Sequence, residues 1–375
     1  MNAMSSSSHF KDLSEFMTKH SICNNNNNEH LEVTHTRIGS KDHNIYGGKF
    51  HIPSSDLPLF FRLYYEDIFV RKKKEYLTEK QLNENGPILV DFDFRYNYDV
   101  NSRQHTAEHI SDMIQLYLDE LKEIFIFTEN VSFPIYVMEK PHVNRVEDKN
   151  LTKDGIHMII GIQMDHSLQL LLREKIIKKL PEIWDLPLIE DYPKVLDEGI
   201  SKGCTNWQLY GSQKPLNEAY KLTYYTLATL DLTDNEFMTV PQTVHDFDLH
   251  NDLFKLSAQY QDHVKFELNP KILDEYNKRK NNNNNKKYNK ANIVLVEDLD
   301  QEIPISDIKD INTLNKAMEY MLNNLKTSEY NIREIHAYTQ ILPAKYYEPG
   351  SHLLNRQVAF ALKHTDERLF LSWIM

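Results

Sequence analysis

The segment Gly86-Pro-Ile-Leu-Val-Asp-Phe-Asp-Phe94 predicts a buried β-strand that carries two carboxylates. It is short, apolar and bounded by Gly-Pro, which is the pattern of a buried strand. Side chains two positions apart on a strand point the same way, so Asp91 and Asp93 share one face and the alternate apolar residues fill the other. Two unpaired carboxylates are costly to bury, and a divalent cation that prefers hard oxygen ligands, Mg²⁺ or Mn²⁺, resolves this conflict. The alternative is an edge strand with a hydrated polar face.

The sequence around this strand alternates between helical and extended patterns. Residues 106–125 carry apolar side chains on one stripe at helical spacing, which predicts an amphipathic helix. Strands and helices in mixed order favour an α+β domain over a strictly parallel α/β domain. Further helices are predicted at 55–70, 167–180, 307–325 and 353–362, and further strands at 134–139, 155–164 and 220–232.

Composition bounds the class of protein. The 375 residues carry 43 Lys and Arg against 55 Asp and Glu, a formal charge of −12, and 41% are hydrophobic, enough for a core. No apolar run approaches the roughly 18 residues that cross a bilayer, and the polar N-terminus does not resemble a secretory signal. Two cysteines cannot form a disulfide framework or a cysteine-rich zinc site. We therefore expect a soluble protein of a reducing compartment, without membrane contact, and not a simple nucleic-acid coating protein.

Two asparagine runs, Asn24–Asn28 and Asn281–Asn285, divide the chain. Polar low-complexity runs bury nothing and predict flexible segments. The expected organisation is a flexible segment at 1–30, a catalytic domain at 31–275, a basic Asn-rich linker at 276–292 and a helical connector at 293–375.

Two further motifs add candidate ligands for a nucleotide. In Lys153-Asp-Gly-Ile-His157, Gly155 has no side chain to block approach, and the histidine is positioned to donate to a phosphate oxygen. Asp197, in an acidic stretch, would complete a three-carboxylate metal site with Asp91 and Asp93. Such a site holds a nucleotide's phosphates and orients an attacking hydroxyl. A structural histidine and a solvated acidic run are the alternatives.

A fourth motif is the segment Asn206-Trp-Gln-Leu-Tyr-Gly-Ser-Gln-Lys-Pro215. Gly211-Ser212 permits close backbone approach to a ligand, and Lys214 supplies a point charge for a phosphate. The same residues would mark a turn at the end of a strand equally well. The sequence has no Walker-type glycine-rich loop, so P-loop chemistry is not expected of it.

In their order along the chain, these motifs resemble the archaeo-eukaryotic primase superfamily. Its pattern of an acid-x-acid strand, a small-x-His strand and a hydrophobic-Asp element is present here as Asp91-Phe-Asp93, Gly155-Ile-His157 and Leu196-Asp197. Over roughly residues 31–260 the chain is similar to the N-terminal primase region of the primase-helicases of nucleocytoplasmic large DNA viruses, the poxvirus-type group. The segments that carry this similarity are Thr36-Arg-Ile-Gly39, Asn44-Ile-Tyr-Gly-Gly48, Gly86–Asp93, Asn206–Pro215 and Tyr220-Lys-Leu-Thr223.

The resemblance implies an α+β primase-polymerase domain with mixed sheets and an RRM-like palm, followed by a small helical domain. The implied activity is synthesis of short primers on single-stranded DNA template from NTPs or dNTPs, in viral DNA replication in the host cytoplasm or nucleus. Members of the group usually continue into an AAA+-type helicase. The helical connector is therefore expected to be truncated, and the chain to be a fragment or a split protein with a helicase partner.

The resemblance also implies roles for single residues. Asp91, Asp93 and Asp197 would be catalytic and bind two divalent ions, Mg²⁺ or Mn²⁺. Arg71, Lys72, Lys73 and Lys74 would contact the template backbone, with a solvated helix end as the alternative. The nucleotide would be bound by His157, Gly155, Lys153, Ser212, Lys214 and Arg37.

Two other classes of function stay open at the level of sequence. An acid-x-acid pair also binds Mn²⁺ and a nucleotide sugar in glycosyltransferases, although His157 and Asp197 would then have no assigned task. A non-catalytic replication adaptor could retain the primase fold for binding alone. The position of Asp154, an extra acid beside the expected phosphate site, is not explained by any of these functions.

Overall fold

The computed structural model describes residues 10–22, 31–128, 130–289, 292–296, 301–304, 308–348 and 350–374. The chain divides into two compact units, residues 1–277 and 278–375. The division falls inside the expected linker, but helix α8 (Pro270–Asn289) runs through that segment, including the second asparagine run. Among the described residues, none of the helices combines the length and the apolar character needed to span a bilayer.

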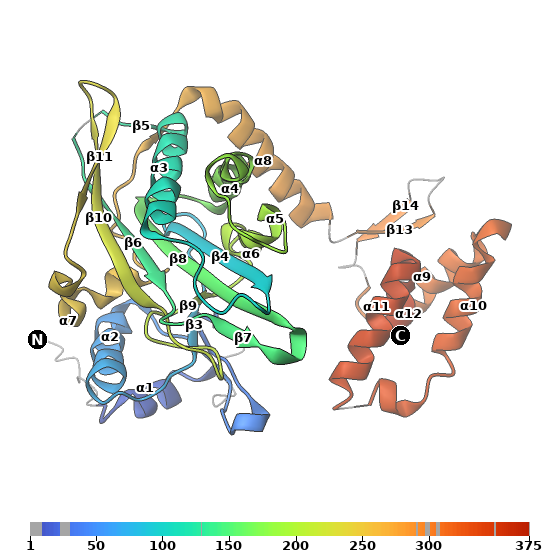
Figure 1. Cartoon of the computed structure of the whole chain (residues 1–375). Coiled ribbons are helices and arrows are strands. Elements are labelled where there is room, and N and C mark those ends of the chain that lie inside the picture. The colour runs from blue at the N-terminus through green and yellow to red at the C-terminus, as the bar shows by residue number, and fades with distance from the viewer. Residues whose placement is uncertain are drawn as a thin grey trace, which may run out of the picture. The chain divides into compact units, whose positions relative to one another are not determined.

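Within the described residues, the first unit is built around a six-stranded antiparallel sheet in the order β11-β10-β6-β8-β4, with β7 paired to β8 (Figure 1). The expected strands at 86–94, 134–139, 155–164 and 220–232 are confirmed as four of its members. The strands are β4 (Pro87–Asn97), β6 (Phe133–Glu139), β7 (Asn144–Val146), β8 (Leu151–Gln163), β10 (Lys221–Asp231) and β11 (Glu236–Pro241).

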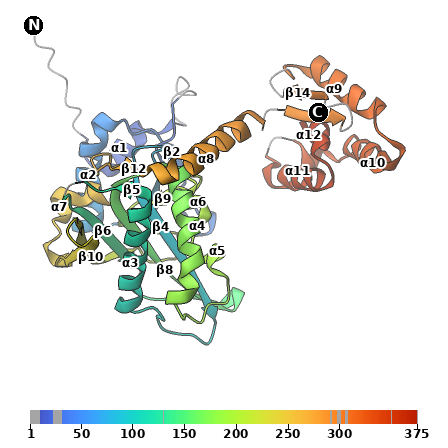
Figure 2. The same cartoon turned by 90° about the horizontal axis from the view of Figure 1, so that it is seen from above.

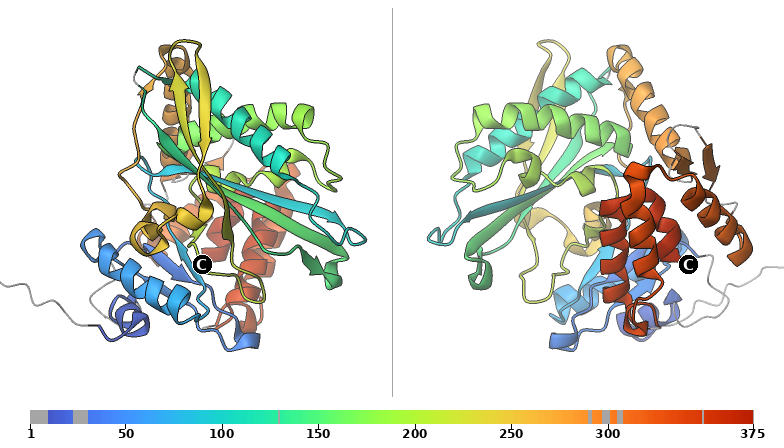
Figure 3. Two further views of the ribbon diagram at one scale, coloured as in Figure 1. Left: turned by 60° about the vertical axis from the view of Figure 1, so that its left-hand side comes forward. Right: turned by 90° about the vertical axis from the view of Figure 1, so that its right-hand side faces the viewer.

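Two long helices, α3 (Ala107–Ile124) and α4 (His166–Ile183), cover one face of this sheet (Figures 2 and 3). Each begins at a side chain that accepts from the backbone of the first turn, Thr106 for α3 and Asp165 for α4. The apolar stripe of α3 packs against the alternate residues of β4. The core between them includes Val90, Phe92, Phe94, Ile110, Met113, Tyr117, Leu121, Leu171 and Ile176.

The connectivity explains how the chain returns to β4. After β4, α3, β6, β8 and α4, the short helix α5 (Tyr192–Val195) leads to Leu196, which forms an antiparallel bridge with Phe92. With that bridge counted as a fourth strand, the spatial order is 4-1-3-2, which is the βαββαβ arrangement of an RRM-like unit. The predicted α+β palm is therefore present, with its last strand reduced to one bridge.

A smaller four-stranded sheet lies in the N-terminal part of the first unit, in the order β2-β1-β3-β9. Its strands are β1 (His35–Arg37), β2 (Gly48–Phe50), β3 (Leu77–Glu79) and β9 (Trp207–Gln208). Helices α1 (Leu13–Lys19) and α2 (Leu57–Tyr65) pack with it around a core that includes Phe16, Phe50, Phe60 and Tyr64. A π-helical turn, Glu66–Val70, continues α2, so the helix expected at 55–70 is confirmed.

The described part of the segment expected to be flexible, 1–30, departs from that expectation. Residues 10–22 contain α1, whose Leu13, Phe16 and Met17 are buried. The helical spacing of its apolar residues is short and is flanked by serine and asparagine runs that are typical of flexible segments. A helix this short is not stable alone, and packing against α2 stabilises it. Residues 1–9 and 23–30 are outside the described residues.

The remaining elements are short. Strands β5 (Phe125–Ile126) and β12 (Glu267–Leu268) pair with each other, and α6 (Glu198–Ser201) and α7 (Leu249–Asp252) each make about one turn. The second unit has a hairpin and helices around a core that includes Leu314, Met318, Met321 and Leu369, and the predicted helices at 307–325 and 353–362 correspond to α9 and α11. Its elements are β13 (Asn292–Val296), β14 (Gln301–Pro304), α9 (Ile311–Asn323), α10 (Tyr330–Thr339), α11 (His352–Thr365) and α12 (Phe370–Ile374).

A fully buried carboxyl on β3 makes stability depend on pH. Burial raises the pKa of Glu79 from 4.5 to about 7, although the Ser257 hydroxyl and the Ala258 N–H both donate to it. The folded state therefore holds this proton more tightly than the unfolded state, and the associated stability is lost as pH rises from about 4.5 through 7. Relative to Glu79→Gln, the wild type is expected to lose up to about 3 kcal/mol between pH 4.5 and pH 8. Urea unfolding at both pH values measures this difference, and parallel pH profiles for the two proteins would contradict it.

Candidate active site

Three carboxylates meet on one face of β4, beside its bridge to Leu196. Asp91 and Asp93 lie two positions apart on the face opposite α3 and α4, as the alternation of the strand predicted. The bridge between Phe92 and Leu196, together with the hydrogen bond from Asp197 N to Asp91 O (2.9 Å), brings Asp197 beside them. One ligand oxygen from each of the three lies within 4.8 Å of the others. The chain thus assembles an all-oxygen donor set of the kind that Mg²⁺ and Mn²⁺ prefer.

The charges in this cluster are frustrated without a cation. Burial and the neighbouring Asp91 raise the pKa of Asp93, and Asp197 raises it further. Burial also opposes ionisation of Asp91, but the charge and polar contact of His157, together with the charges of Lys214 and Lys140, outweigh burial and lower the pKa of Asp91. Asp91 Oδ1 is buried with no hydrogen-bond partner among the described residues. An orphaned buried oxygen next to two further carboxylates is the arrangement that a bound metal ion would complete.

His157 lies directly across from Asp91 in the pairing of β4 with β8. Its Nε2 is 3.5 Å from Asp91 Oδ1, too long for a good hydrogen bond but close enough for a charge interaction. The imidazole stacks on Tyr220 with ring centroids 3.7 Å apart, and Trp207 packs 4.3 Å away. These two aromatic rings fix the orientation of His157 at the rim of the carboxylate cluster.

Gly155 lies across from Asp93 in the same pairing. A Cβ at this position would lie 2.6 Å from Phe92 O and 3.0 Å from the Tyr220 hydroxyl. The glycine is therefore required by the close approach of the β4 backbone and, in second place, by the Tyr220 hydroxyl, reasons that the sequence motif alone does not reveal.

Adding one methyl group at Gly155 is expected to damage both fold and site. In Gly155→Ala the clash is with backbone of β4 between Asp91 and Asp93, so the two strands must separate at the site. We expect a loss of about 1–3 kcal/mol in stability and weaker metal binding. Gly86→Ala is the control and should cost less, because its nearest contacts would be Leu82 Cβ at 3.2 Å and the backbone oxygens of Leu82 and Ala258 at 3.4 and 3.5 Å. Equal unfolding midpoints and metal affinities for the two variants would contradict the assignment.

Lysines from three segments surround the acids. The charge of Lys214 lowers the pKa of both Asp91 and Asp93. This interaction is consistent with the predicted position of Lys214 near the acids. Lys153 pairs with Arg95 across β8 and β4, two positions beyond the Gly155–Asp93 pair and therefore on the same face. Lys140 was not expected from the sequence. It follows β6 directly, and its charge also acts on Asp91 and Asp93.

Two nucleotide-binding assignments are not supported by the geometry. Ser212 is fully buried, its hydroxyl accepts from Leu77 N and bonds to the Tyr64 hydroxyl, and no surface is left for a ligand. The prediction for Ser212 is therefore wrong, because its polar group is used to join β3 to the loop after β9. Arg37 makes a bidentate ion pair with Glu75 (2.8 Å for both contacts), which gives it a structural partner within its own sheet.

The basic strip Arg71–Lys74 is exposed, as expected for a template contact or a solvated helix end. Arg71 and Lys73 each contact the buried carboxylate of Asp67 at 2.8 Å, and about half of each side chain stays accessible. The single negative charge of Asp67 thus neutralises one of the four positive charges of the strip. Lys72 takes a left-handed backbone conformation (φ 56°), so the strip turns sharply at this residue.

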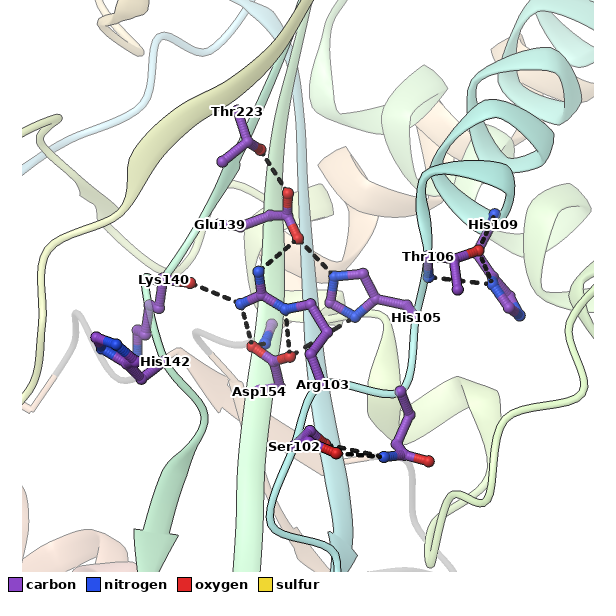
Figure 4. Close-up of polar contacts among 12 residues, drawn as sticks. Ser102, Arg103, His105, Thr106, His109, Glu139, Lys140, His142, Asp154 and Thr223 are labelled. Carbon is purple, nitrogen blue, oxygen red and sulfur yellow. Dashed lines mark hydrogen bonds and ion pairs between the residues drawn. The ribbon is translucent and has the colours of Figure 1, made fainter.

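A buried ionic network lies behind the site and accounts for Asp154 (Figure 4). Asp154 points to the face opposite His157 and receives two contacts from Arg103, at 2.9 and 3.1 Å. Arg103 also contacts Glu139 at 2.9 Å and donates to Lys140 O at 2.6 Å. His105 and Thr223 complete the bonding of Glu139, with contacts of 2.7 and 2.5 Å. Asp154 is therefore a structural acid. Through Arg103 it connects the start of β8 and the end of β6 to the loop after β4.

The comparisons with known proteins agree with this geometry. Residues 39–226 match the family model described as the C962R protein N-terminal AEP domain, AEP standing for archaeo-eukaryotic primase. The chain is also 31% identical over 244 residues to a protein of Acanthamoeba polyphaga mimivirus that is named as a helicase, L207/L206. The match covers 64% of this chain and 23% of the mimivirus protein. The region matched by the family model includes all three carboxylates and His157.

Proposed function

Because this chain belongs to the archaeo-eukaryotic primase family of the C962R type, we propose that it is a metal-dependent nucleotidyltransferase that synthesises primers on single-stranded DNA during viral DNA replication. The observation that carries the proposal is the convergence of Asp91, Asp93 and Asp197, whose ligand oxygens lie within 4.8 Å of one another. Two strand residues and one residue from a distant bridge are brought together at the cost of mutual repulsion. A catalytic metal site is the function that explains this cost.

The three carboxylates would hold two divalent ions, Mg²⁺ or Mn²⁺. When bound, such ions lower the pKa of an attacking 3′-hydroxyl and neutralise the charge that develops on the leaving pyrophosphate. The chain's own contribution is to fix the donor oxygens: Asp91 and Asp93 through the pleat of β4, and Asp197 through the N–H of Ile200, which donates to its Oδ1 at 2.9 Å. This N-cap contact orients Asp197 toward the strand.

The remaining roles follow from position around the acids. His157, held by Tyr220 and Trp207, would donate to the triphosphate of an incoming NTP or dNTP, with Lys214 and Lys153 supplying positive charge. The exposed strip Arg71–Lys74 would contact the template backbone through its accessible half. Binding of single-stranded DNA should then weaken steeply with salt.

A helicase is the proposed partner. The mimivirus relative is named as a helicase, and the chain matches 23% of its length, which leaves ample sequence in that protein for a motor domain. In this proposal the region described here makes primers at a replication site and works beside a helicase domain or subunit.

A template-dependent synthesis assay tests the function. The protein is incubated with single-stranded DNA, labelled NTPs or dNTPs and Mg²⁺ or Mn²⁺, and the products are resolved by length. We expect short template-dependent products that disappear with EDTA and with Asp91→Ala. Transfer from a nucleotide sugar instead of primer synthesis would favour a glycosyltransferase. Template binding without synthesis, both alone and with added helicase, would favour a non-catalytic adaptor.

A further inference from the structure

Lys140 occupies a row of residues that crosses the site. Lys221 of β10 pairs with Glu139 of β6, and Glu139 pairs with Ile156 of β8. One step further along this register lie Tyr220, Lys140 and Gly155, and Gly155 is across from Asp93. Two contacts bear this out. The Lys140 ammonium is 5.1 Å from the centre of the Tyr220 ring, and the Tyr220 hydroxyl reaches over Gly155.

The backbone of Lys140 is held from behind by the ionic network. Arg103 Nη2 donates to Lys140 O at 2.6 Å, and the same guanidinium is fixed by Asp154 and Glu139 (Figure 4). Because Pro141 follows and the strand ends at Glu139, the lysine is anchored on both sides. A lysine presented on an immobilised backbone loses less entropy when it binds a ligand.

The positive charges around Lys140 favour binding of an anion. Burial and then the charge of Lys214 lower the pKa of Lys140, so two ammonium groups converge where solvent is partly excluded. Among the described residues, Lys140 has no carboxylate within ion-pair distance, and its ammonium lies over the face of the Tyr220 ring. Two lysines and an imidazole at the rim of a metal site match a polyphosphate.

We propose that Lys140 is an additional substrate-binding residue, which binds the triphosphate of the incoming nucleotide together with Lys214. The inference rests on the proposed function, because it assigns a new ligand to the same site. Lys140 lies between the acid-x-acid strand and the small-x-His strand, in neither motif, and reaches the site only through the pairing of β6 with β8. The Tyr220 ring contacts the ammonium group, and the strand register places Lys140 beside Gly155 and Asp93.

Direct binding measurements test the inference. Calorimetry measures the affinity of the full chain for Mg²⁺-ATP, inorganic tripolyphosphate and AMP. Lys140→Met keeps the apolar stem over Tyr220 and is expected to weaken ATP and tripolyphosphate binding about 10- to 100-fold, with a smaller effect on AMP. Lys140→Arg should restore most of the affinity. Lys178→Met, which removes an exposed lysine from α4, is the matched control and should bind like the wild type.

The outcomes separate the inference from the function on which it rests. Wild-type affinity for ATP in Lys140→Met, in a protein with an unchanged melting temperature, overturns the inference alone. Equal losses for AMP and ATP overturn it as well, because they would indicate a general disturbance of the site. A wild-type protein that binds neither ATP nor tripolyphosphate overturns the proposed function and the inference together.

Discussion

Asp93→Asn is expected to reduce primer synthesis by at least about 10³-fold while leaving the protein folded. Asparagine keeps the shape of the side chain but removes the charge that a divalent ion requires. In the absence of metal the variant should be as stable as the wild type or more stable, because burial and Asp91 already disfavour the ionised form of Asp93. Loss of activity without loss of stability is the signature of a residue retained for chemistry.

Measurements on this variant should combine synthesis rate, Mn²⁺ affinity and urea unfolding in EDTA. Asp99→Asn provides the control. Asp99 is exposed in the turn after β4, so this substitution removes the same charge from a nearby position outside the site. Synthesis by Asp93→Asn within tenfold of the wild type would rule out the three-carboxylate site. An unfolded variant would instead indicate a structural role for Asp93.

Arg103→Met is expected to cost about 3–5 kcal/mol of stability. The substitution leaves Glu139 and Asp154 buried without the guanidinium that contacts both. Removing one partner from a buried ionic cluster is far more costly than removing an exposed ion pair, because the remaining charge cannot return to water. Arg145→Met, which removes an exposed arginine that packs on Tyr98, should change stability by less than about 1 kcal/mol.

The cost of Arg103→Met should depend on pH. Burial alone would raise the pKa of Glu139, but its bonds to His105 and Thr223 and the charge of Arg103 lower it overall. This carboxylate therefore contributes stability above its ordinary pKa, and the contribution is lost as pH falls. The difference between wild type and Arg103→Met should be greatest near pH 7 and shrink in acid, as followed by urea unfolding. A difference independent of pH would mean that lost packing, not lost charge, causes the effect.

The sequence predicted the features that depend on a local periodic pattern. The period-2 pattern of β4 was sufficient to place Asp91 and Asp93 on one face and Phe92 on the other, and the period of 3.6 residues was sufficient for α3. The order of the acid-x-acid, small-x-His and hydrophobic-Asp motifs indicated the family, which the match over residues 39–226 confirms. These signals succeed because alternation and helical spacing depend only on neighbours in the chain.

The tertiary structure decided which distant groups meet. Asp197 joins the acids only through a one-residue bridge to Phe92, and Lys140 joins them through the register of β6 with β8. Ser212 resembled a ligand in its motif, yet packing against Tyr64 buries it completely. Asp154 has no role in the motif that contains it, but the ion pair with Arg103, which is distant in sequence, accounts for it. The physical reason is the same in each case: strand pairing and burial join residues far apart in sequence, and no local period encodes which of them will face the same site.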